Sequence, residues 1–520
     1  MSNRPATDVR ADGGAIDRIS VWWLALALFV AHVVVNRSSA FEFQRDEFLY
    51  LAMGDHLRWW HMDFPPFIAL LANVTRAIAG DSLVAIRIGP AIAASLLVVA
   101  AARAARMLGG STAAQWLAAL AIVVAPVVLR PGMLFQPVIF DQLWWTCALL
   151  ALIQRQRSDD ARWWMAVGVS LGLGLLTKFS IAFIGIGIVA GVLSTPLRRD
   201  LLTRWPWLAL LIALAIGSAS LLGQVNLHFP IIWQMRDLNA GQLGRRGVTA
   251  FVSEQPLLPG PVAFAMAVVG WIWMSWGNRA STTRAAAIAM LVSWLLLSWN
   301  RGKGYYGAPV YPLLIAAGAV AMSQLSPVRL RRVLIAVTAL LLVTLSAIVL
   351  PLVLPVQSPP ATAQYAKRLG LDVATRTNYG TSLQLPQDFA DMLGWEALVR
   401  ATADEWSKLP DNDRARAVIT ARNYGEAGAL DHYGPRYGLP RVVSGAGSYW
   451  FFGPGDLPGD VMISLGERMN VLMQLYTEWR VQRIVGTVWA VEEEQHVPIT
   501  LCRGPRQSLQ AVWPSFDPAR

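Results

Sequence analysis

Charged side chains are scarce in this chain of 520 residues. Only 15% of the residues are Asp, Glu, Lys or Arg, whereas 55% are hydrophobic, and the mean hydropathy is +0.43. A soluble domain carries about 25% charged and about 45–50% apolar residues. The deficit of charge excludes an ordinary soluble protein and predicts a protein that lies in a lipid bilayer.

Cysteine is almost missing, because the chain holds only Cys147 and Cys502. Two cysteines so far apart provide neither a disulfide framework nor the spacing of a cysteine metal site. The sequence also lacks internal repeats and low-complexity segments. The formal charge of +11 is what basic cytoplasmic loops produce, so we expect no nucleic-acid partner.

Apolar runs long enough to cross hydrocarbon recur along the first two-thirds of the chain. They predict an α-helical polytopic membrane protein with about eleven spans. The first run has no small-x-small cleavage site, so we interpret it as a retained span. The expected spans are Val21–Val35, Leu83–Met107, Ala113–Val128, Ile139–Ile153, Trp163–Thr177, Ile181–Leu193, Trp207–Gly223, Pro261–Trp276, Ala285–Trp299, Tyr311–Met322 and Val333–Leu354.

Short basic loops predict the orientation. One alternate set of loops is rich in Arg, as in Arg155, Arg157 and Arg162, so it should face the cytoplasm together with the N-terminus. An odd number of spans then places the first loop, 41–80, and the tail, 356–520, on the other side. The excess of Arg over Lys indicates a GC-rich bacterial genome, so we expect the bacterial inner membrane and a periplasmic tail.

The tail changes character after the last span. We predict a transmembrane domain over 1–355 and a soluble α/β domain over 356–520. Tyr449–Phe452 are expected as strand core, with sugar binding as the alternative. The expected strands are Ala415–Thr420, Arg441–Ser444, Asp460–Ser464, Arg483–Val488 and Ile499–Cys502, and the expected helices are Glu426–His432 and Met469–Trp479.

The first loop gathers acidic residues at the edge of the membrane. Arg45-Asp46-Glu47 opens a helical pattern that we expect to continue to Trp60, and Asp63 follows beside Pro65-Pro66. Asp46 and Tyr50 share one face of that helix. Acids in such a place serve a proton, a metal or a cationic ligand. The alternative for Asp46 is a helix N-cap.

The outer loops also hold cations, which the positive-inside rule would deplete. Either they form salt bridges with the acids of the first loop, or they hold an anionic ligand such as a phosphate. These residues are Arg45, Arg58, Arg76, Arg130, Arg236, Arg245, Arg246, Arg301 and Lys303.

The string from Arg45-Asp46-Glu47-Phe48 to Asp63-Phe64-Pro65-Pro66 resembles the first-loop motif of protein O-mannosyltransferases and bacterial aminoarabinose transferases. These are membrane glycosyltransferases of the GT-C class. Gly172–Lys178 is similar to a glycine-rich span that ends in Thr-Lys in the bacterial branch. Lys303-Gly304-Tyr305-Tyr306 and Phe140-Asp141-Gln142 extend the resemblance.

The resemblance implies an enzyme of the GT-C fold. A sugar linked to a polyprenyl phosphate would enter from the lipid bilayer and pass, with inversion, to an acceptor protein, lipid or glycan at the outer face. Asp46 and Glu47 would be the catalytic residues: Asp46 would orient or deprotonate the acceptor hydroxyl, and Glu47 would be its neighbouring acid. Lys303, Arg245, Arg246, Lys178 and Arg45 would bind the donor phosphate, and Asp63, Tyr50, Asp141 and Tyr305 would support the site.

Several alternatives remain open at this stage. Lys178 can snorkel to the interface, Asp141 is expected to cap a helix, and Tyr305 is expected in an aromatic belt. A divalent cation held by first-loop acids and His61 is open as well, without a strict ligand spacing.

A transporter or flippase of a lipid-linked saccharide is the alternative function. Transporters place ionisable residues near mid-span, in broken helices and often in repeated halves. The expected spans here are nearly free of internal charge, so the sequence favours chemistry at one face of the membrane.

Overall fold

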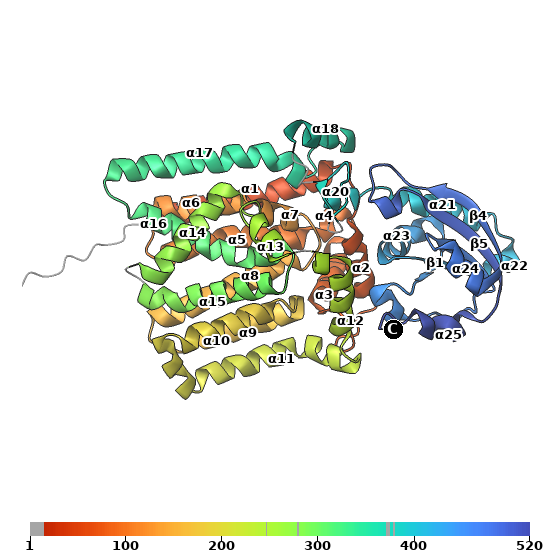
Figure 1. Cartoon of the computed structure of the whole chain (residues 1–520), viewed down its shortest axis with the longest axis horizontal. Coiled ribbons are helices and arrows are strands. Elements are labelled where there is room, and N and C mark those ends of the chain that lie inside the picture. Colours follow the sequence, from red (N-terminus) through yellow and green to blue (C-terminus); the bar gives the residue numbers. More distant parts are fainter. Residues whose placement is uncertain (1–14, 246, 278–279, 371–374, 378–379, 520) are drawn as a thin grey trace, which may run out of the picture.

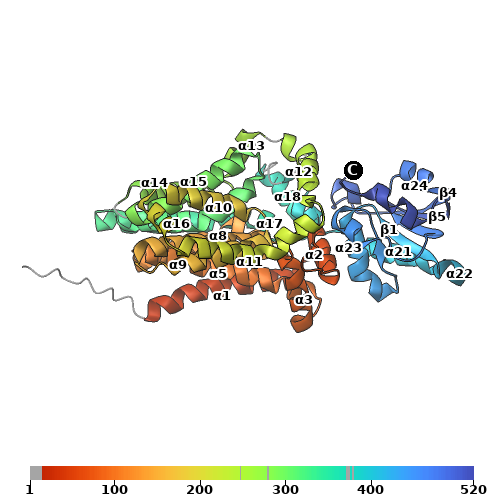
Figure 2. The same cartoon turned by 90° about the horizontal axis from the view of Figure 1, so that it is seen from below.

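The computed structural model describes residues 15–245, 247–277, 280–370, 375–377 and 380–519. The helices of the first two-thirds lie side by side in one elongated bundle, and a smaller α/β unit closes one end of it (Figures 1 and 2). The bundle and the α/β unit correspond to the two parts expected from the sequence.

Six helical segments in the described part of the chain are long and apolar enough to cross a membrane. They lie in α1 (Ala15–Ser38), α4 with α5 (Leu83–Ile86 and Ile88–Met107), α11 (Trp205–Asn226), α15 (Ala280–Trp299), η3 with α16 (Gly304–Val310 and Tyr311–Ser323) and α17 (Val328–Val353). The multi-pass membrane architecture is therefore confirmed.

The expected count of about eleven spans is not confirmed. The number rises from six to eight only if two bent pairs each form one span: α6 (Thr112–Val123) with α7 (Pro126–Gly132), and α10 (Ile181–Leu193) with η1 (Pro196–Leu202). The pairs bend by 56° and 102°, and each second member begins with a proline that has no N–H for the preceding helix. Two further expected spans form the shorter apolar helices α9 (Trp163–Thr177) and α14 (Pro261–Trp276), and α8 (Val138–Arg157) packs among them.

Glycines let neighbouring helices of the bundle approach closely. A Cβ on Gly187 or Gly191 of α10 would collide with the backbone of Ala289 or Ala285 in α15. Likewise, a Cβ on Gly168 of α9 would collide with the backbone of Ala209 in α11. Small residues at helix contacts are the usual basis of packing within lipid, where the hydrophobic effect between helices is weak.

Short helices cover the end of the bundle that faces the α/β unit. Figure 1 shows α2, α3 and α12 across that end. The helix expected to reach Trp60 stops earlier, at Asp55, and Trp60 lies in the following loop. The short helices outside the long ones are α2 (Arg45–Asp55), α3 (Phe67–Ala79), α12 (Pro230–Gly241), η2 (Leu243–Arg245), α13 (Val248–Glu254), α18 (Pro359–Leu369) and α20 (Gln387–Ala390).

The α/β unit is built on one sheet of five strands with the order β2-β1-β3-β5-β4. β2, β1 and β3 are parallel, and β5 and β4 are antiparallel to their neighbours. The strands are β1 (Ala417–Ala421), β2 (Val442–Val443), β3 (Val461–Leu465), β4 (Tyr476–Val485) and β5 (Val497–Pro505). The helices are α21 (Trp395–Ser407), α22 (Asp411–Arg414), α23 (Tyr424–Tyr433), α24 (Met469–Leu475) and α25 (Leu509–Val512), with the short turns η4 (Gly434–Tyr437), η5 (Gly447–Phe452), η6 (Glu492–Glu494) and η7 (Trp513–Phe516).

Two local predictions in the tail are wrong. The helix expected over Met469–Trp479 ends at Leu475, because the following residues pair with β5 as strand β4. Tyr449–Phe452 form the turn η5 rather than a strand, although Tyr449 is buried as expected of core. At Leu475 the pairing of the following strand overrides the local helical pattern.

The bundle and the α/β unit share one buried core. Phe48 of α2 packs edge-on against Trp395 of α21 and Tyr433 of α23, and Gly428 leaves room for it. Glu42 accepts hydrogen bonds from the backbone of Gly394 and Glu396. These contacts hold the tail firmly on the acidic first loop.

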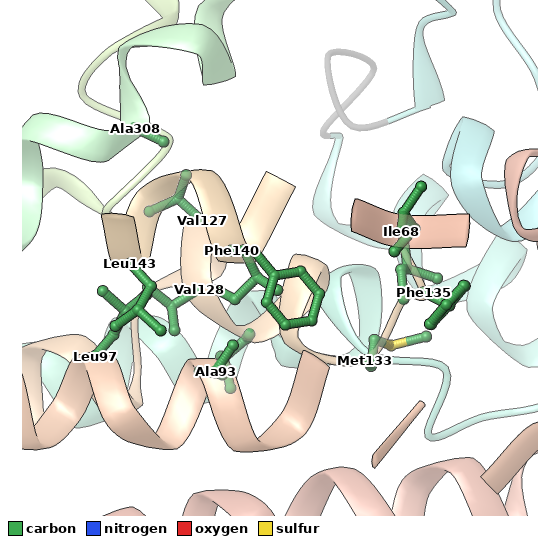
Figure 3. Close-up of a cluster of buried hydrophobic side chains, with 14 of the residues drawn as sticks. Ile68, Ala93, Leu97, Val127, Val128, Met133, Phe135, Phe140, Leu143 and Ala308 are labelled. Carbon is green, nitrogen blue, oxygen red and sulfur yellow. The ribbon is translucent and has the colours of Figure 1, made fainter. Parts of the chain in front are cut away.

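A tight apolar cluster lies beneath that loop. Figure 3 shows Phe140 of α8 between Met133 and Phe135 on one side and Val127 and Val128 on the other. All five side chains are buried. The cluster fixes the loop between α7 and α8, and this loop approaches the acidic residues of α2.

Candidate functional site

Asp46 lies in the first turn of α2, and residues from two distant parts of the chain bind its carboxylate. Its Oδ1 accepts a hydrogen bond of 2.9 Å from the hydroxyl of Tyr424, the first residue of α23. Its Oδ2 accepts a bond of 3.3 Å from Nε2 of Gln136, just before α8. The carboxylate therefore lies where the membrane bundle meets the α/β unit.

Asp46 does not cap its helix. The N-cap is Gln44, whose side chain accepts from the backbone N–H of Asp46 at 2.8 Å. Glu47 completes the capping box by accepting from the backbone N–H of Gln44 at 2.6 Å. The capping interpretation of Asp46 is wrong, and its carboxylate is left to face Gln136 and Tyr424.

Burial raises the pKa of Asp46 above its ordinary value. The bond from Tyr424 and the charges of Arg45 and Lys303 act in the opposite direction and limit the rise. Nearby Asp391 shows the same effect more strongly, because burial raises its pKa to about 8. At neutral pH Asp391 is therefore mostly protonated, which reduces the negative charge beside Asp46.

Glu47 is fully buried and paired with Arg87 through two bonds. Nε and Nη2 of Arg87 donate to the two carboxylate oxygens at 2.8 and 2.6 Å, and the backbone N–H of Phe135 donates at 2.6 Å. Arg87 also binds Oδ1 of Asn36 in α1 at 3.0 Å. Glu47 therefore ties α2 to the start of α5 and to the loop before α8, an arrangement that positions its neighbour Asp46.

Arg45 pairs with carboxylates of the tail. Its Nη1 lies 2.6 Å from Oε1 of Glu493, and its Nη2 lies 3.4 Å from Oε1 of Glu494. Two other outer cations also form salt bridges, Arg76 with Asp55 and Asp81, and Arg130 with Asp388. For these three arginines the structure shows the salt-bridge alternative, with some of the acids supplied by the tail.

A second group of polar side chains surrounds Lys178, directly after α9. The ammonium nitrogen lies 4.6 Å from the ring centre of Tyr306 and 5.3 Å from that of Tyr305. These tyrosines therefore contact a cation and do more than line an aromatic belt. Burial raises the pKa of Tyr50 well above its ordinary value, and the nearby Asp46 and Tyr306 raise it further, so Tyr50 interacts with members of both groups.

Asp141 belongs to the group around Lys178. It does not cap α8, whose N-cap is Pro137, so the expected capping role is wrong. Its Oδ1 accepts from Nε1 of Trp145 at 3.0 Å, and its Oδ2 accepts from Oγ of Ser180 at 2.8 Å. Its charge also interacts with that of Lys178. Asp141 thus fixes the turn that carries Lys178.

The structure brings only some of the expected phosphate-binding residues close to Asp46 or to the tyrosines around Lys178. Lys303 precedes η3 and lies close enough to Asp46 to influence its pKa. Arg245 ends η2, and Arg246 lies outside the described residues. Lys303 and Arg45 therefore lie near Asp46, and Lys178 lies against the two tyrosines.

Asp63 serves a different contact. Its Oδ2 accepts from Oγ of Ser448 in the tail at 2.7 Å and from Nε2 of Gln234 in α12 at 3.2 Å. Burial raises the pKa of Asp63 to about 6. Beside it, the rings of His56 and Phe452 stack at 3.9 Å. Asp63 therefore supports the junction between the first loop and the α/β unit.

The acids of the first loop do not fit a shared divalent cation. The carboxylate of Glu47 already accepts hydrogen bonds from Arg87 and from two backbone N–H groups. The carboxylate of Asp63 accepts from Ser448 and Gln234. Among the described residues, groups of three or more His, Cys, Asp or Glu side chains with the geometry of a metal site are absent. We therefore assign no step to a metal.

Sequence reasoning missed the partners of the acidic residues. Tyr424, Gln136, Arg87 and Asp391 were not singled out as site residues. Local patterns contain no signal for them, since each lies 40 or more positions from the residue it affects.

The family described as dolichyl-phosphate-mannose-protein mannosyltransferase matches residues 63–222 of the chain. This segment runs from Asp63 into α11 and excludes Asp46 and the tail. Curated protein sequences give no match.

Solved structures extend the comparison to nearly the whole chain. The crystal structure of ArnT from Cupriavidus metallidurans bound to undecaprenyl phosphate is similar with a TM-score of 0.60 at 17% identity, over 94% of this chain and 98% of that one. The crystal structure of the same protein in the apo state is similar with a TM-score of 0.59 at 18% identity, over 93% of this chain and 98% of that one. The chain thus has the ArnT fold, including most of the tail. The expected resemblance to GT-C glycosyltransferases is confirmed.

Proposed function

We propose that this protein is an inverting glycosyltransferase of the bacterial inner membrane. It moves a sugar from a polyprenyl-phosphate-linked donor to an acceptor at the periplasmic face. The observation that carries the proposal is the position of the Asp46 carboxylate. Tyr424 and Gln136 donate hydrogen bonds to it at the end of the bundle, near Lys303. The ArnT fold and its complex with undecaprenyl phosphate support a donor of this class.

Asp46 acts as the general base. A hydroxyl oxygen of the acceptor attacks the anomeric carbon while its proton passes to the carboxylate. Because burial raises the pKa of Asp46, the group is a stronger base than an exposed aspartate. Tyr424 and Gln136 fix the direction of the carboxylate, so the base is in place before the acceptor arrives.

Lys178 and Lys303 act on the leaving group. As the bond between the sugar and the phosphate breaks, the electron pair stays on the polyprenyl phosphate, which gains negative charge. Fixed cations in a poorly solvated site stabilise this charge strongly. Lys178 is held by the rings of Tyr305 and Tyr306 and by Asp141, so its ammonium group needs little reorganisation during the reaction.

The replacement Asp46→Asn tests the proposal. Asparagine keeps one oxygen that can accept from Tyr424, but it places an NH2 group toward Gln136 and cannot take a proton. We expect transfer to fall by about 10²–10⁴-fold with little change in thermal unfolding. The assay is transfer of a labelled sugar from a synthetic polyprenyl-phosphate sugar in nanodiscs. Asp55→Asn, at the other end of α2, is the matched control and should remain active.

Two results would contradict the proposal. One is near-normal transfer by the Asp46→Asn variant. The other is movement of labelled lipid-linked sugar across liposomes without its consumption, which would identify the alternative, a transporter or flippase.

A further inference from the structure

A cavity opens at the carboxyl ends of the parallel strands in the α/β unit, apart from the site around Asp46. Its volume is about 190 Å³. Residues after β1, β2 and β3 line it, together with α24, α25 and η7, which Figure 1 shows beside the strands. In open α/β sheets ligands bind at this edge, where neighbouring connections run to opposite sides. Here β1 is that point, because β2 and β3 flank it.

The floor of the cavity carries hydroxyl groups. Thr420 of β1 and Ser464 of β3 line it and lie opposite each other in the sheet. Thr500 of β5 continues the row, paired with Ser464. Ser464 and Thr500 are each 1% exposed, and in the described part of the chain their hydroxyls have no hydrogen-bond partner. Buried hydroxyls are normally satisfied, so this row points to a ligand.

The walls are apolar and partly aromatic. Trp513 and Phe516 line one side, with ring centres 6.0 Å apart, and Leu472 and Tyr476 line another. The rim adds one guanidinium, from Arg422, and one carboxylate, from Glu467. Ring faces beside hydroxyls and a balanced pair of charges fit a neutral ring that has both C–H and O–H groups, which is the chemistry of a sugar.

The arrangement does not suit a phosphate. In related sheets the phosphate lies at the N-terminus of the helix that follows β1. Here that helix is α23, and the side chain of Asn423 already accepts from two of its backbone N–H groups. Glu426 adds a buried carboxylate at the same turn. An anion would meet a helix start whose N–H groups are already bonded.

A chain of ion pairs links the cavity to the first loop. Nη2 of Arg422 lies 3.6 Å from Oε2 of Glu493, and Oε1 of Glu493 lies 2.6 Å from Nη1 of Arg45. Arg45 precedes Asp46. The helix that starts two residues after Arg422 supplies Tyr424, which binds Asp46. The edge of the sheet that holds the cavity therefore faces the proposed catalytic carboxylate.

We propose that this cavity binds one neutral sugar unit of a glycan acceptor. That the bound sugar belongs to the acceptor rests on the proposed function. The binding of a sugar in the cavity does not require that the enzyme turn over. The volume suits a single small ring, being below the roughly 300–1,000 Å³ of drug-sized pockets. A glycan held here extends toward Asp46 from a site that the donor phosphate does not use.

Direct binding to the full-length protein in nanodiscs tests the inference. The probes are the methyl glycosides of glucose, galactose, mannose and N-acetylglucosamine, titrated by saturation-transfer NMR, with inorganic phosphate as the anionic comparison. We expect at least one glycoside to bind saturably and phosphate not to compete. Asp46→Asn should bind the glycoside as well as the unchanged protein does, which separates this inference from the proposed catalysis.

Three variants locate the binding. Ser464→Ala should weaken it about tenfold, the effect of one hydrogen bond. The same change should leave the melting temperature unchanged or raised, because the hydroxyl has no partner within the described structure. Trp513→Ala should abolish binding, and Trp479→Ala, on β4 outside the cavity, is the matched control and should not affect it.

The outcomes are distinct. Absence of saturable glycoside binding would overturn the inference and leave water as the partner of the hydroxyls. Binding that survives both Ser464→Ala and Trp513→Ala would place the sugar elsewhere. Competition by a polyprenyl-phosphate-linked sugar would assign the cavity to the donor and overturn the acceptor role. A fully active Asp46→Asn variant with intact glycoside binding would refute the proposed catalysis and keep the cavity as a sugar site.

Discussion

The hydroxyl of Tyr424 donates a hydrogen bond of 2.9 Å to Oδ1 of Asp46, although 378 positions separate the two residues. The bond joins the α/β unit to the first loop of the membrane bundle. It lowers the pKa of a carboxylate that burial raises, so it adjusts the protonation of the proposed base.

Replacing Tyr424 by Phe should shift the pH dependence of transfer. Loss of the bond raises the pKa of Asp46 further, so the acidic limb of the pH–rate profile should move to higher pH. Activity on that limb should fall and should recover as the pH is raised. Tyr437→Phe, which removes a hydroxyl bonded to Glu396 in the same unit, is the control. An unshifted profile would show that Tyr424 does not affect the base.

Breaking the buried pair of Glu47 and Arg87 should destabilise the protein. Arg87→Met leaves an unpaired carboxylate at a fully buried position, with an expected loss of about 3–5 kcal/mol in the free energy of unfolding. Adding Glu47→Gln should recover part of this loss, and a double-mutant cycle measures the coupling. Arg483→Met breaks an exposed pair with Asp404 and should change stability by less than about 1 kcal/mol. Independent, additive effects would argue against the structural role of the pair.

Lys178→Met should weaken the use of the donor. The ammonium between the rings of Tyr305 and Tyr306 is lost while the length of the side chain is kept. We expect KM for the polyprenyl-phosphate sugar to rise by roughly tenfold to a hundredfold, because a charge-assisted contact to phosphate disappears. Steady-state kinetics measure the KM. The control is Lys408→Met, which replaces an exposed lysine at the end of α21. An unchanged KM would exclude Lys178 from donor binding.

Asp63→Asn should stabilise the protein at neutral pH and remove a pH dependence. Since the folded pKa is about 6 and the usual value is 3.8, the folded state binds more protons between these values. Stability should therefore fall as pH rises from about 4 to about 6, and remain lower above that range. Asparagine still accepts from Ser448, so the variant should lose this slope and gain roughly 1–3 kcal/mol at pH 7. Thermal unfolding across pH tests the slope, and a slope that persists would assign it to another group.

The sequence predicted the parts of this protein that depend on local pattern. The membrane bundle, the α/β tail, and the acidic turn at Asp46 follow from hydropathy, strand-like runs and charge. The number of spans did not follow, because Pro126 bends one expected span and because the runs over Trp163–Thr177 and Pro261–Trp276 form helices that are shorter than a full span.

The site itself was only half predictable. Asp46 and Lys178 stand out in the sequence, but the residues that hold them come from distant segments. In the sequence Glu47 looked like a second catalytic acid. Its pairing with Arg87 could not be seen there, because that pairing depends on the packing of α5 against α1. The sequence around Tyr424 does not predict its contact with the first loop. A hydrogen bond between residues so far apart in the sequence depends on the tertiary fold.

The docking of α23 on α2 also sets an order of events during biosynthesis. A growing chain that has completed the bundle already contains Asp46, yet it lacks Tyr424 and the Glu493 that holds Arg45. The arrangement around Asp46 is complete only after residue 494 has left the ribosome and the tail has folded against the loop. Until then the carboxylate of Asp46 lacks the partner that the tail supplies.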